Sequence, residues 1–246
     1  MRTRGVSLAA LGAIAMAVVL VGCSEASRLK AKCTSGDVQA CTTLGEMYAT
    51  GTRVAADFPR AAEMYQQACD RGVAEACNAV GELYEHHSEL GAGLERAEQA
   101  FEAACSGGSA AGCLNLGLVF AARDDKPRAA SMYERACGSG LMPACHHLAV
   151  AYDQGVGVMR DLDKAMTLYG DACGHKVIDS CLALGGLYVA GERLDQDITR
   201  GTYFYGEAMK IYEAGCEGGN DADCKQRDRL RTRIAILKET AKAPAT

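Results

Sequence analysis

The chain has 246 residues, and its 26 Lys and Arg are outnumbered by 31 Asp and Glu, which gives a formal net charge of −5 at pH 7. An acidic chain lacks the clustered cations that a nucleic-acid backbone requires. Most of the aromatic residues (10 Tyr and 4 Phe, with no Trp) occupy the repeat positions described below, which leaves few to stack on bases. Nucleic acid is therefore excluded as a partner.

The N-terminus has the organisation of a secretory signal. Arg2 and Arg4 precede an almost entirely apolar run over residues 6–21, which ends in Leu-Val-Gly before Cys23. This ending resembles the lipobox of bacterial lipoproteins, in which the cysteine is acylated and becomes the mature N-terminus. The alternative is a short membrane-spanning anchor. We expect a signal peptide over residues 1–22, export by the Sec route, lipidation of Cys23 and a mature charge of −7 once both arginines are removed.

A short tether is expected between the lipid and the folded protein. Ser24 follows the acylated cysteine, where lipoproteins kept in the inner membrane usually carry aspartate, so the resemblance implies an outer-membrane address facing the periplasm. Residues 23–32 are assigned to the lipidated N-terminus and tether, with folded structure beginning by about Ala26. A tether of this kind reaches only ~20–30 Å, so the protein lies near the bilayer.

The other twelve of the 13 cysteines form pairs eight residues apart, and successive pairs begin 36, 36, 32, 36 and 43 residues after one another. An even number of cysteines in an exported chain predicts disulfides. Zinc is disfavoured because seven residues separate the members of a pair, rather than the two to four of zinc fingers and ribbons. The predicted bridges are Cys33–Cys41, Cys69–Cys77, Cys105–Cys113, Cys137–Cys145, Cys173–Cys181 and Cys216–Cys224.

Two sets of positions recur around the cysteines with helical spacing. In five of the six pairs, an alanine stands eight residues before the first cysteine, an aromatic residue four before it and a small residue one before it. These positions share one helix face. In five pairs, an apolar residue stands three residues after the second cysteine, a glycine or alanine four after it and an aromatic residue seven after it. The first set predicts a helix B over 61–69, 97–105, 129–137, 165–173 and 208–216. The second predicts a helix A over 41–48, 77–84, 113–120, 145–152 and 181–188.

Glycines mark two places where the backbone is constrained. The fourth helix A position is glycine in four of five repeats, although glycine costs roughly 1 kcal/mol in a helix, so we expect a neighbouring helix to approach closely there. Another glycine stands three residues after the first cysteine of five pairs, whereas Lys176 stands there in the remaining one. A glycine just past a helix end supplies the left-handed cap of a tight turn. Each pair therefore joins helix B of one repeat to helix A of the next, within disulfide distance.

Pairs of helices repeating about every 36 residues predict a solenoid. The pattern C-x2-L-G-x2-Y-x2-G followed by D-x2-(K/R)-A-x3-Y-x3-C resembles the Sel-one-like repeat, a relative of the tetratricopeptide repeat, and its clearest copy spans Cys145 to Cys173. The cysteine pairs resemble the Hcp branch of that family, secreted bacterial proteins with one disulfide per repeat. The resemblance covers residues 33–224 and implies an all-α fold: a right-handed α/α superhelical solenoid of about five disulfide-linked helix pairs with terminal capping helices.

The repeats depart from the pattern in informative places. The clearest copy has a Gly-Val-Gly loop at residues 155–157 between its two helices. The third repeat is four residues shorter than the usual 36 and has Asp124 to Pro127 in place of this loop. The fifth repeat is seven residues longer than the usual 36. Seven residues make about two helical turns, so a lengthened helix keeps its phase, and Tyr212 takes the aromatic position. Its extra segment carries Tyr203, Phe204 and Tyr205, which either pack the longer helix or form an exposed anchor for a partner. Leu230, Ile234 and Leu237 predict a capping helix within residues 225–246.

No set of catalytic residues emerges from the sequence. Some Hcp-branch proteins carry a penicillin-binding or β-lactamase label, but the one S-x-x-K, at residues 27–30, lacks the S-D-N and K-T-G partner motifs, so a β-lactam-binding or hydrolysing protein remains an alternative on family label alone. The adjacent histidine pairs 86–87 and 146–147 point about 100° apart in a helix, so they predict surface histidines rather than a metal site. We expect no cofactor.

The function predicted is a binding scaffold for a protein or peptide in the cell envelope. In related arrays the A helices line the concave face, which places the positions two, five and nine after the helix A cysteine in a groove. A plain solvated surface is the other interpretation of these positions. The basic run over residues 225–233 is either a solvated helix face or a contact with anionic membrane or envelope polymer. The candidate groove residues are Glu46, Glu82, Asn115, His147 and Gln154, with Thr43 and His86 beside them.

Overall fold

A computed structural model describes residues 25–87, 90–91, 93–192 and 194–241. All regular structure within these ranges is helical, which confirms the predicted all-α solenoid. The chain divides into two compact units, Met1–Val119 and Phe120–Thr246, which are described in turn. The predicted signal peptide and the lipidation site at Cys23 lie outside the described residues.

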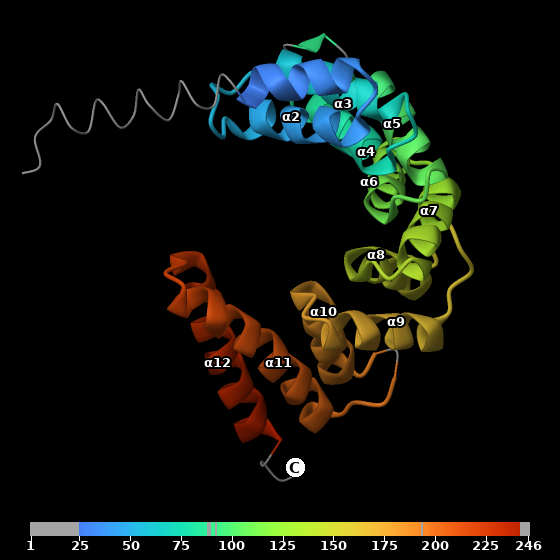
Figure 1. Ribbon diagram of the computed structural model, residues 1–246. Coiled ribbons are helices and arrows are strands. Elements are labelled where there is room, and N and C mark those ends of the chain that lie inside the picture. Colours follow the sequence, from blue (N-terminus) through green and yellow to red (C-terminus); the bar gives the residue numbers. More distant parts are fainter. Residues whose placement is uncertain (1–24, 88–89, 92, 193, 242–246) are drawn as a thin grey trace, which may run out of the picture. The chain divides into compact units, whose positions relative to one another are not determined.

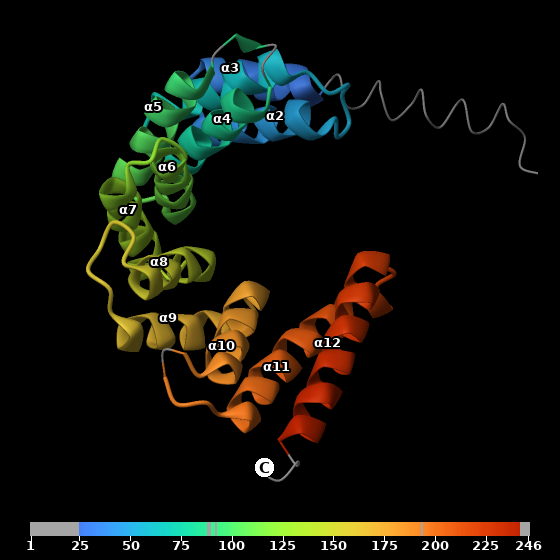
Figure 2. The same ribbon diagram turned by 180° about the vertical axis from the view of Figure 1, so that it is seen from behind.

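Unit 1 is a stack of helices in which α2, α3, α4 and α5 each lie against the next along the chain (Figure 1, Figure 2). Residues 25–34 are helical and bury Ala26, so helical structure covers most of the segment 23–32 that was assigned to the tether. The helices that follow are α2 (Val38–Thr50), α3 (Phe58–Cys69), α4 (Ala74–His86), α5 (Gly93–Ser106) and α6 (Ala110–Ala122), the last of which crosses into unit 2.

Unit 2 continues the alternation of A and B helices and ends in a longer pair. Its helices are α7 (Lys126–Gly138), α8 (Met142–Gln154), α9 (Leu162–Gly174), α10 (Ile178–Ala190), α11 (Ile198–Glu217) and α12 (Asp221–Thr240). Helices α11 and α12 lie side by side in both views (Figure 1, Figure 2). No helix among the described residues combines the length and the apolar character needed to cross a membrane.

The twelve paired cysteines lie where helix B of one repeat meets helix A of the next. Each pair is disulfide-bonded in the structure, with Cα–Cα distances of 4.4–4.8 Å. Cys69–Cys77 joins α3 to α4, for example, and Cys173–Cys181 joins α9 to α10. Such bridges are typical of oxidising extracellular or periplasmic compartments, so the solenoid belongs to one of these.

The helix A glycines receive the aromatic rings of the following helix B, as the sequence predicts. A Cβ added at Gly45 would lie 2.8 Å from the ring of Tyr65, and one at Gly81 would lie 2.6 Å from the ring of Phe101. Both rings are buried, with 8% and 0% of their surface exposed. Glycine therefore lets each A helix approach the ring that fills the core of its own repeat.

A repeated cap joins the start of each B helix to the preceding A helix. In four of the five repeats an aspartate accepts a hydrogen bond from the backbone N–H three residues later and pairs with the cation at that position. The same cation lies over the helix A aromatic: Arg60 is 5.6 Å from the ring of Tyr48, and Lys164 is 5.1 Å from that of Tyr152. The aspartate and the cation of the motif thus fix how the two helices of one repeat meet.

The turn between repeats requires a left-handed backbone. Glycines three residues after the first cysteine have φ of 87–105°, as predicted for a C-terminal cap. Lys176 adopts the same region, with φ 67°, although a residue with a side chain there costs about 1–3 kcal/mol. This position therefore tolerates strain that the other five turns avoid.

The fifth repeat corrects one sequence assignment. Tyr205, rather than Tyr212, fills its core: a Cβ added at Gly185 would lie 2.5 Å from the Tyr205 ring, and the side chain is 2% exposed. The two additional turns therefore lengthen α11 beyond the core aromatic. The aromatic cluster is divided, since Tyr203 is 60% exposed while Phe204 is partly buried and stacks on Tyr188 at 5.8 Å.

Helix α12 covers the end of unit 2. Leu230 is buried against the core of this unit, and Ile234 and Leu237 pack beside it. Arg233 lies 4.6 Å from the Tyr205 ring, and Arg231 pairs with Glu213 of α11. Part of the basic run therefore holds α12 in place.

Candidate protein-interaction face

The predicted groove residues lie on the A helices, on a surface that we call the A face of each unit. In unit 1 this surface comprises Glu46 of α2, Glu82 of α4 and Asn115 of α6. In unit 2 it comprises His147 and Gln154, both of α8. The two units present different chemistry there.

In unit 1 a hydrogen-bonded network crosses from α4 to α6. The Asn115 side-chain amide donates to Asn78 Oδ1 at 2.9 Å and to Glu82 Oε1 at 3.2 Å, and the Asn78 amide donates to the same Glu82 oxygen at 2.9 Å. Asn78 is 8% exposed, whereas the Glu82 side chain faces solvent. The network therefore holds one carboxylate in a fixed orientation at the surface of the A face.

A second carboxylate lies close to the same place. Burial, together with the smaller effect of the negative charges of Glu46 and Glu82, raises the pKa of Tyr65 to about 12. Tyr65, at the base of the A face, therefore stays a neutral hydrogen-bond donor at physiological pH. The neighbouring position of α6 adds an apolar group, because Leu118 is 40% exposed three residues after Asn115. The unit 1 A face thus combines two carboxylates, an amide and an exposed leucine.

In unit 2 the A face carries histidines that pack between helices rather than standing free at the surface, which differs from the sequence prediction. His146 Nδ1 lies 2.9 Å from the hydroxyl oxygen of Ser180, which joins α8 to α10, and His147 stacks on Tyr133 at 5.0 Å. Burial lowers the pKa of both imidazoles. The negative charge of Asp179 opposes this effect but is smaller, so both pKa values remain lowered. The balance favours neutral rings, which suit a packed interface.

Gln154 borders a pocket of about 320 Å3 between α8 and α10. Leu182, Ala183 and Gly186 of α10 form its apolar side, and Asp153 and Glu192 add carboxylates at its border. Its volume is at the small end of the range of ligand pockets, and it is also large enough for a side chain of a partner. No group of three or more His, Cys, Asp or Glu is placed to hold a metal ion within the part of the chain that the structure describes.

Ser27 and Lys30, the residues of the S-x-x-K sequence, line a separate pocket of about 400 Å3 near the start of unit 1. The same pocket contains the Asp57–Arg60 ion pair, at 3.2 Å, and the ring of Tyr48. These residues belong to the repeated cap described above, so the pocket is explained by the repeat framework.

Sequence reasoning did not identify Asn78 or Ser180, and it placed His146 at the surface. Asn78 and His146 both follow a helix A cysteine by one residue, and Ser180 precedes one. A residue one position after the cysteine and a residue five positions after it are four apart, so they face the same way on a helix. Asn78 and Glu82 have this spacing, so the sequence could have indicated that Asn78 lies on the A face beside Glu82.

Helix pairs joined by disulfides, with a polar face that varies from repeat to repeat, define a helical-repeat scaffold. The family model described as "Sel1 repeat" matches residues 38–73, 74–108, 143–173 and 178–220. The chain therefore belongs to the Sel1-repeat family, whose scaffold is typical of protein–protein interaction. The match omits residues 109–142, where the sequence has its shortened third repeat.

Two solved structures share the fold, and a third is a weaker match. A Sel1 repeat protein from Oxalobacter formigenes is 20% identical, with a TM-score of 0.64 over 81% of this chain and 87% of that one. The immunity protein PA5088 from Pseudomonas aeruginosa is 19% identical, with a TM-score of 0.51 over 76% and 72% of the two chains. Cysteine rich protein B of Helicobacter pylori is 25% identical, with a TM-score of 0.43 over 51% and 93%. A comparison with proteins of curated function found no match.

Proposed function

We propose that this protein is a lipid-anchored scaffold of the bacterial cell envelope, held at the outer membrane through acylated Cys23 and facing the periplasm. The lipobox-like sequence before Cys23 supports the anchor, and the six disulfides support an oxidising compartment. The solenoid then presents its A face to a protein or peptide partner close to the membrane.

The observation that carries the proposal is the composition of the unit 1 A face. The side-chain amides of Asn78 and Asn115 hold the Glu82 carboxylate in place. The Glu46 carboxylate lies near Tyr65, as Glu82 does, and Leu118 is exposed on the same face. An orientation fixed in advance lowers the entropic cost of binding. The partner segment that this surface suits is an extended or helical peptide carrying Lys or Arg next to an apolar side chain.

Site-specific photo-crosslinking in intact cells tests the A face. A photoreactive amino acid at Leu118 should give a discrete cross-linked protein, whereas one at Glu102, an exposed residue of α5, is the matched control and should not. Glu46→Lys, which removes none of the hydrogen bonds described above, should reduce the Leu118 product several-fold without changing the melting curve. Equal cross-linking from both positions, or no effect of the charge reversal, would contradict the proposal.

The anchor is tested separately. Incorporation of an alkyne-labelled fatty acid into the full-length protein should be lost in Cys23→Ser, and the variant should leave the membrane fraction. The alternative function is measured by nitrocefin turnover: hydrolysis by the purified protein that disappears on substitution of an A face residue would favour β-lactam chemistry over a scaffold.

A further inference from the structure

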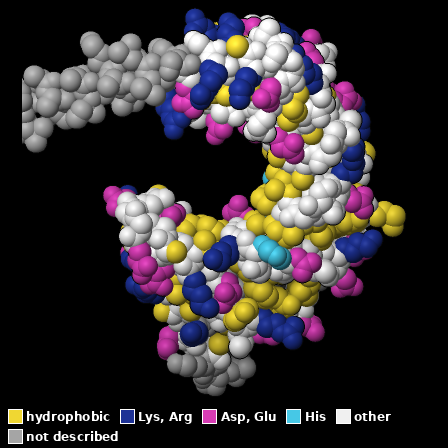
Figure 3. Space-filling view, in the orientation of Figure 1, with side chains coloured by type: hydrophobic (Ala, Val, Ile, Leu, Met, Phe, Trp, Pro, Cys, Tyr) yellow, Lys and Arg dark blue, Asp and Glu magenta, His cyan; other side chains and the backbone are white. Residues whose placement is uncertain are grey.

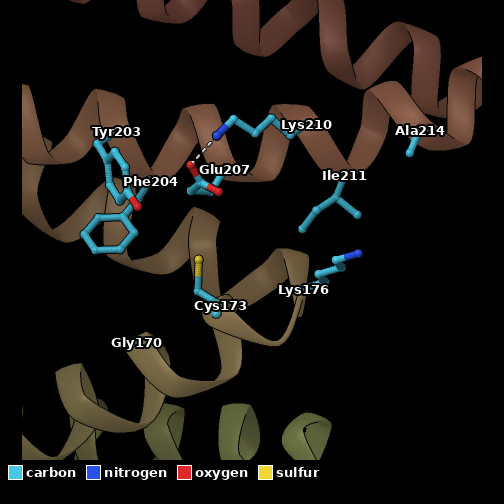
Figure 4. Close-up of a pocket in the computed structure, with 10 residues that line it drawn as sticks. Gly170, Cys173, Lys176, Tyr203, Phe204, Glu207, Lys210, Ile211 and Ala214 are labelled. Carbon is cyan, nitrogen blue, oxygen red and sulfur yellow. Dashed lines mark hydrogen bonds and ion pairs between the residues drawn. The ribbon is translucent and has the colours of Figure 1, made fainter.

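Unit 2 carries a groove on the side of its B helices, between α9 and α11. It has a volume of about 410 Å3 and is bordered by the Cys173–Cys181 disulfide. Phe204, Glu207 and Ile211 of α11 face Cys173 of α9 across it, with Lys176 at one end (Figure 4). These residues lie on B helices, so the groove is distinct from the A face.

The same groove recurs in unit 1 between α3 and α5, with a volume of about 450 Å3 and a different lining. There the Gln66 amide donates to Asp70 at 2.7 Å, the Tyr84 hydroxyl lies 3.4 Å from Gln66 Oε1, and Arg96 donates to the Tyr84 oxygen at 2.9 Å. Polar groups of the α3–α5 groove therefore satisfy one another. This groove is an internal reference for the one in unit 2.

On the α9 side of the unit 2 groove, the repeat-equivalent residues lack a side chain. Gly170 and Gly174 replace Gln66 and Asp70, so the hydrogen bonds of Gln66 cannot form, whereas Arg200 and Tyr188 keep the places of Arg96 and Tyr84. A Cβ at either glycine would meet no atom within 4 Å, which means that helix packing does not require glycine at these positions.

The opposite wall becomes more aromatic, and Glu207 stands there where α5 has Ala103. Tyr203 and Phe204 stand where α5 has Gln99 and Ala100, and Tyr203 is 60% exposed. Hydrophobic side chains reach the surface of unit 2 between charged ones (Figure 3). Exposed aromatic side chains beside an apolar groove are typical of residues that dominate binding energy at protein interfaces.

The charge at this groove is unbalanced. Lys210 is paired with Glu207 at 2.7 Å, but Lys176 makes no ion pair among the described residues. Lys176 also keeps its left-handed backbone at a turn where the other five repeats have glycine. Strain retained at one of six equivalent positions suggests a functional reason for the side chain.

We infer that the α9–α11 groove is a second docking site, and that it takes a segment of a partner protein in which a large apolar side chain stands next to a carboxylate. The apolar side chain lies over Gly170 and Gly174, against Phe204 and Ile211. The carboxylate pairs with the Lys176 ammonium. Charge complementarity with the unpaired lysine selects this occupant over a purely apolar one.

Two capped dipeptides serve as probes on the oxidised, full-length protein: N-acetyl-Phe-Glu-amide and N-acetyl-Phe-Gln-amide. Titration followed by NMR should shift amide signals of residues 170–176 and 203–211. We expect the Glu probe to bind about two- to fivefold more tightly than the Gln probe, which is the range of a solvent-exposed ion pair.

Three variants separate binding from folding. Gly170→Gln introduces the side chain that Gln66 has in unit 1, and it should weaken the binding of both probes at least about fivefold. Gly138→Gln is the matched control, at an open and exposed glycine of α7, and it should leave the binding of both probes unchanged. Lys176→Gly should raise the melting temperature, because glycine adopts the left-handed backbone conformation without the strain that a side chain causes. The same variant should abolish the preference for the Glu probe.

The opposed effects of Lys176→Gly on stability and on selectivity distinguish a binding role from a structural one. Three results would overturn the inference: no shift at the groove with millimolar probe, unchanged binding in Gly170→Gln, or a Glu preference that survives in Lys176→Gly.

Discussion

Replacing Gly185 by alanine tests the close approach of helix and ring that holds each repeat together. The new Cβ would lie 2.5 Å from Cδ1 and Cε1 of Tyr205, where ordinary contacts are 3.4–4 Å. The ring would have to move by roughly 1 Å to relieve such an overlap. The ring has little room to move, since Tyr205 is only 2% exposed. The guanidinium of Arg233, a residue of α12, also lies 4.6 Å from the centre of the ring.

The magnitude follows from two opposing effects. Overpacking of a well-packed core costs about 1–3 kcal/mol. Replacing glycine by alanine inside a helix returns about 1 kcal/mol. The net loss for Gly185→Ala is therefore about 1 kcal/mol, which lowers the melting temperature by about 2–4 °C in a protein of this size. One repeat already has alanine at this position: Ala149 belongs to the same buried cluster as Tyr169, so the framework accepts the methyl group there.

The matched control is Gly206→Ala in the neighbouring helix α11, where a Cβ meets no atom within 4 Å. It should raise stability by about 0.5–1 kcal/mol, because only the helix propensity changes. Both variants are compared with the wild type by circular dichroism during urea and thermal unfolding, with the disulfides intact. If the two substitutions shift stability in the same direction, the steric explanation of the helix A glycines is wrong.

Three further predictions concern the disulfides and the titrating groups. Replacing Cys105 and Cys113 by serine should lower the free energy of unfolding by ~2.5 kcal/mol, as expected from chain entropy for so short a loop, and calorimetry of the oxidised proteins measures it. Burial holds the pKa of His146 and His147 below 6.5, so as the pH falls these histidines bind protons in the unfolded chain before they do in the folded one. Stability should therefore fall as the pH drops below about 6.5. In urea unfolding between about pH 7.5 and 5.5, a variant with glutamine at both positions should lose most of this pH dependence. Since the pKa of Tyr65 is raised to about 12, the difference in phenolate absorbance between the wild type and Tyr65→Phe should appear near that pH, and stability should be lost as the pH rises from about 10 towards 12; a difference that appears near 10 would contradict the burial of this hydroxyl.

Much of the fold is written in the sequence because the repeat supplies several independent copies of each signal. The helix A glycines predicted a close approach, and Gly45 and Gly81 each face a ring in the structure. Turn glycines such as Gly72 predicted the left-handed cap, which is present. A local rule that recurs five times is readable without tertiary information, because chance agreement at every copy is improbable.

The fifth repeat shows where this reasoning stops. A seven-residue extension nearly preserves helix phase, so Tyr205 and Tyr212 both satisfy the face pattern read backwards from Cys216. Only the contact with Gly185 identifies Tyr205 as the core residue. The separation of 20 residues between glycine and ring, which Gly45 and Tyr65 share, would have resolved the choice if the pattern had been read forwards from helix A.

The candidate A face was the least predictable part, because its residues do not repeat. The cap, the ring beneath glycine and the disulfide recur from repeat to repeat, and they use helix positions other than those of the A face. The α4 position one after the cysteine carries Asn78, which bonds within unit 1, and the equivalent α8 position carries His146, which bonds to Ser180. Because the recurring contacts hold the helices whichever residue stands there, these positions are free to differ in chemistry. Substitutions such as Glu46→Lys should therefore change partner choice far more than stability, which is the behaviour expected of a scaffold whose framework and binding surface use separate residues.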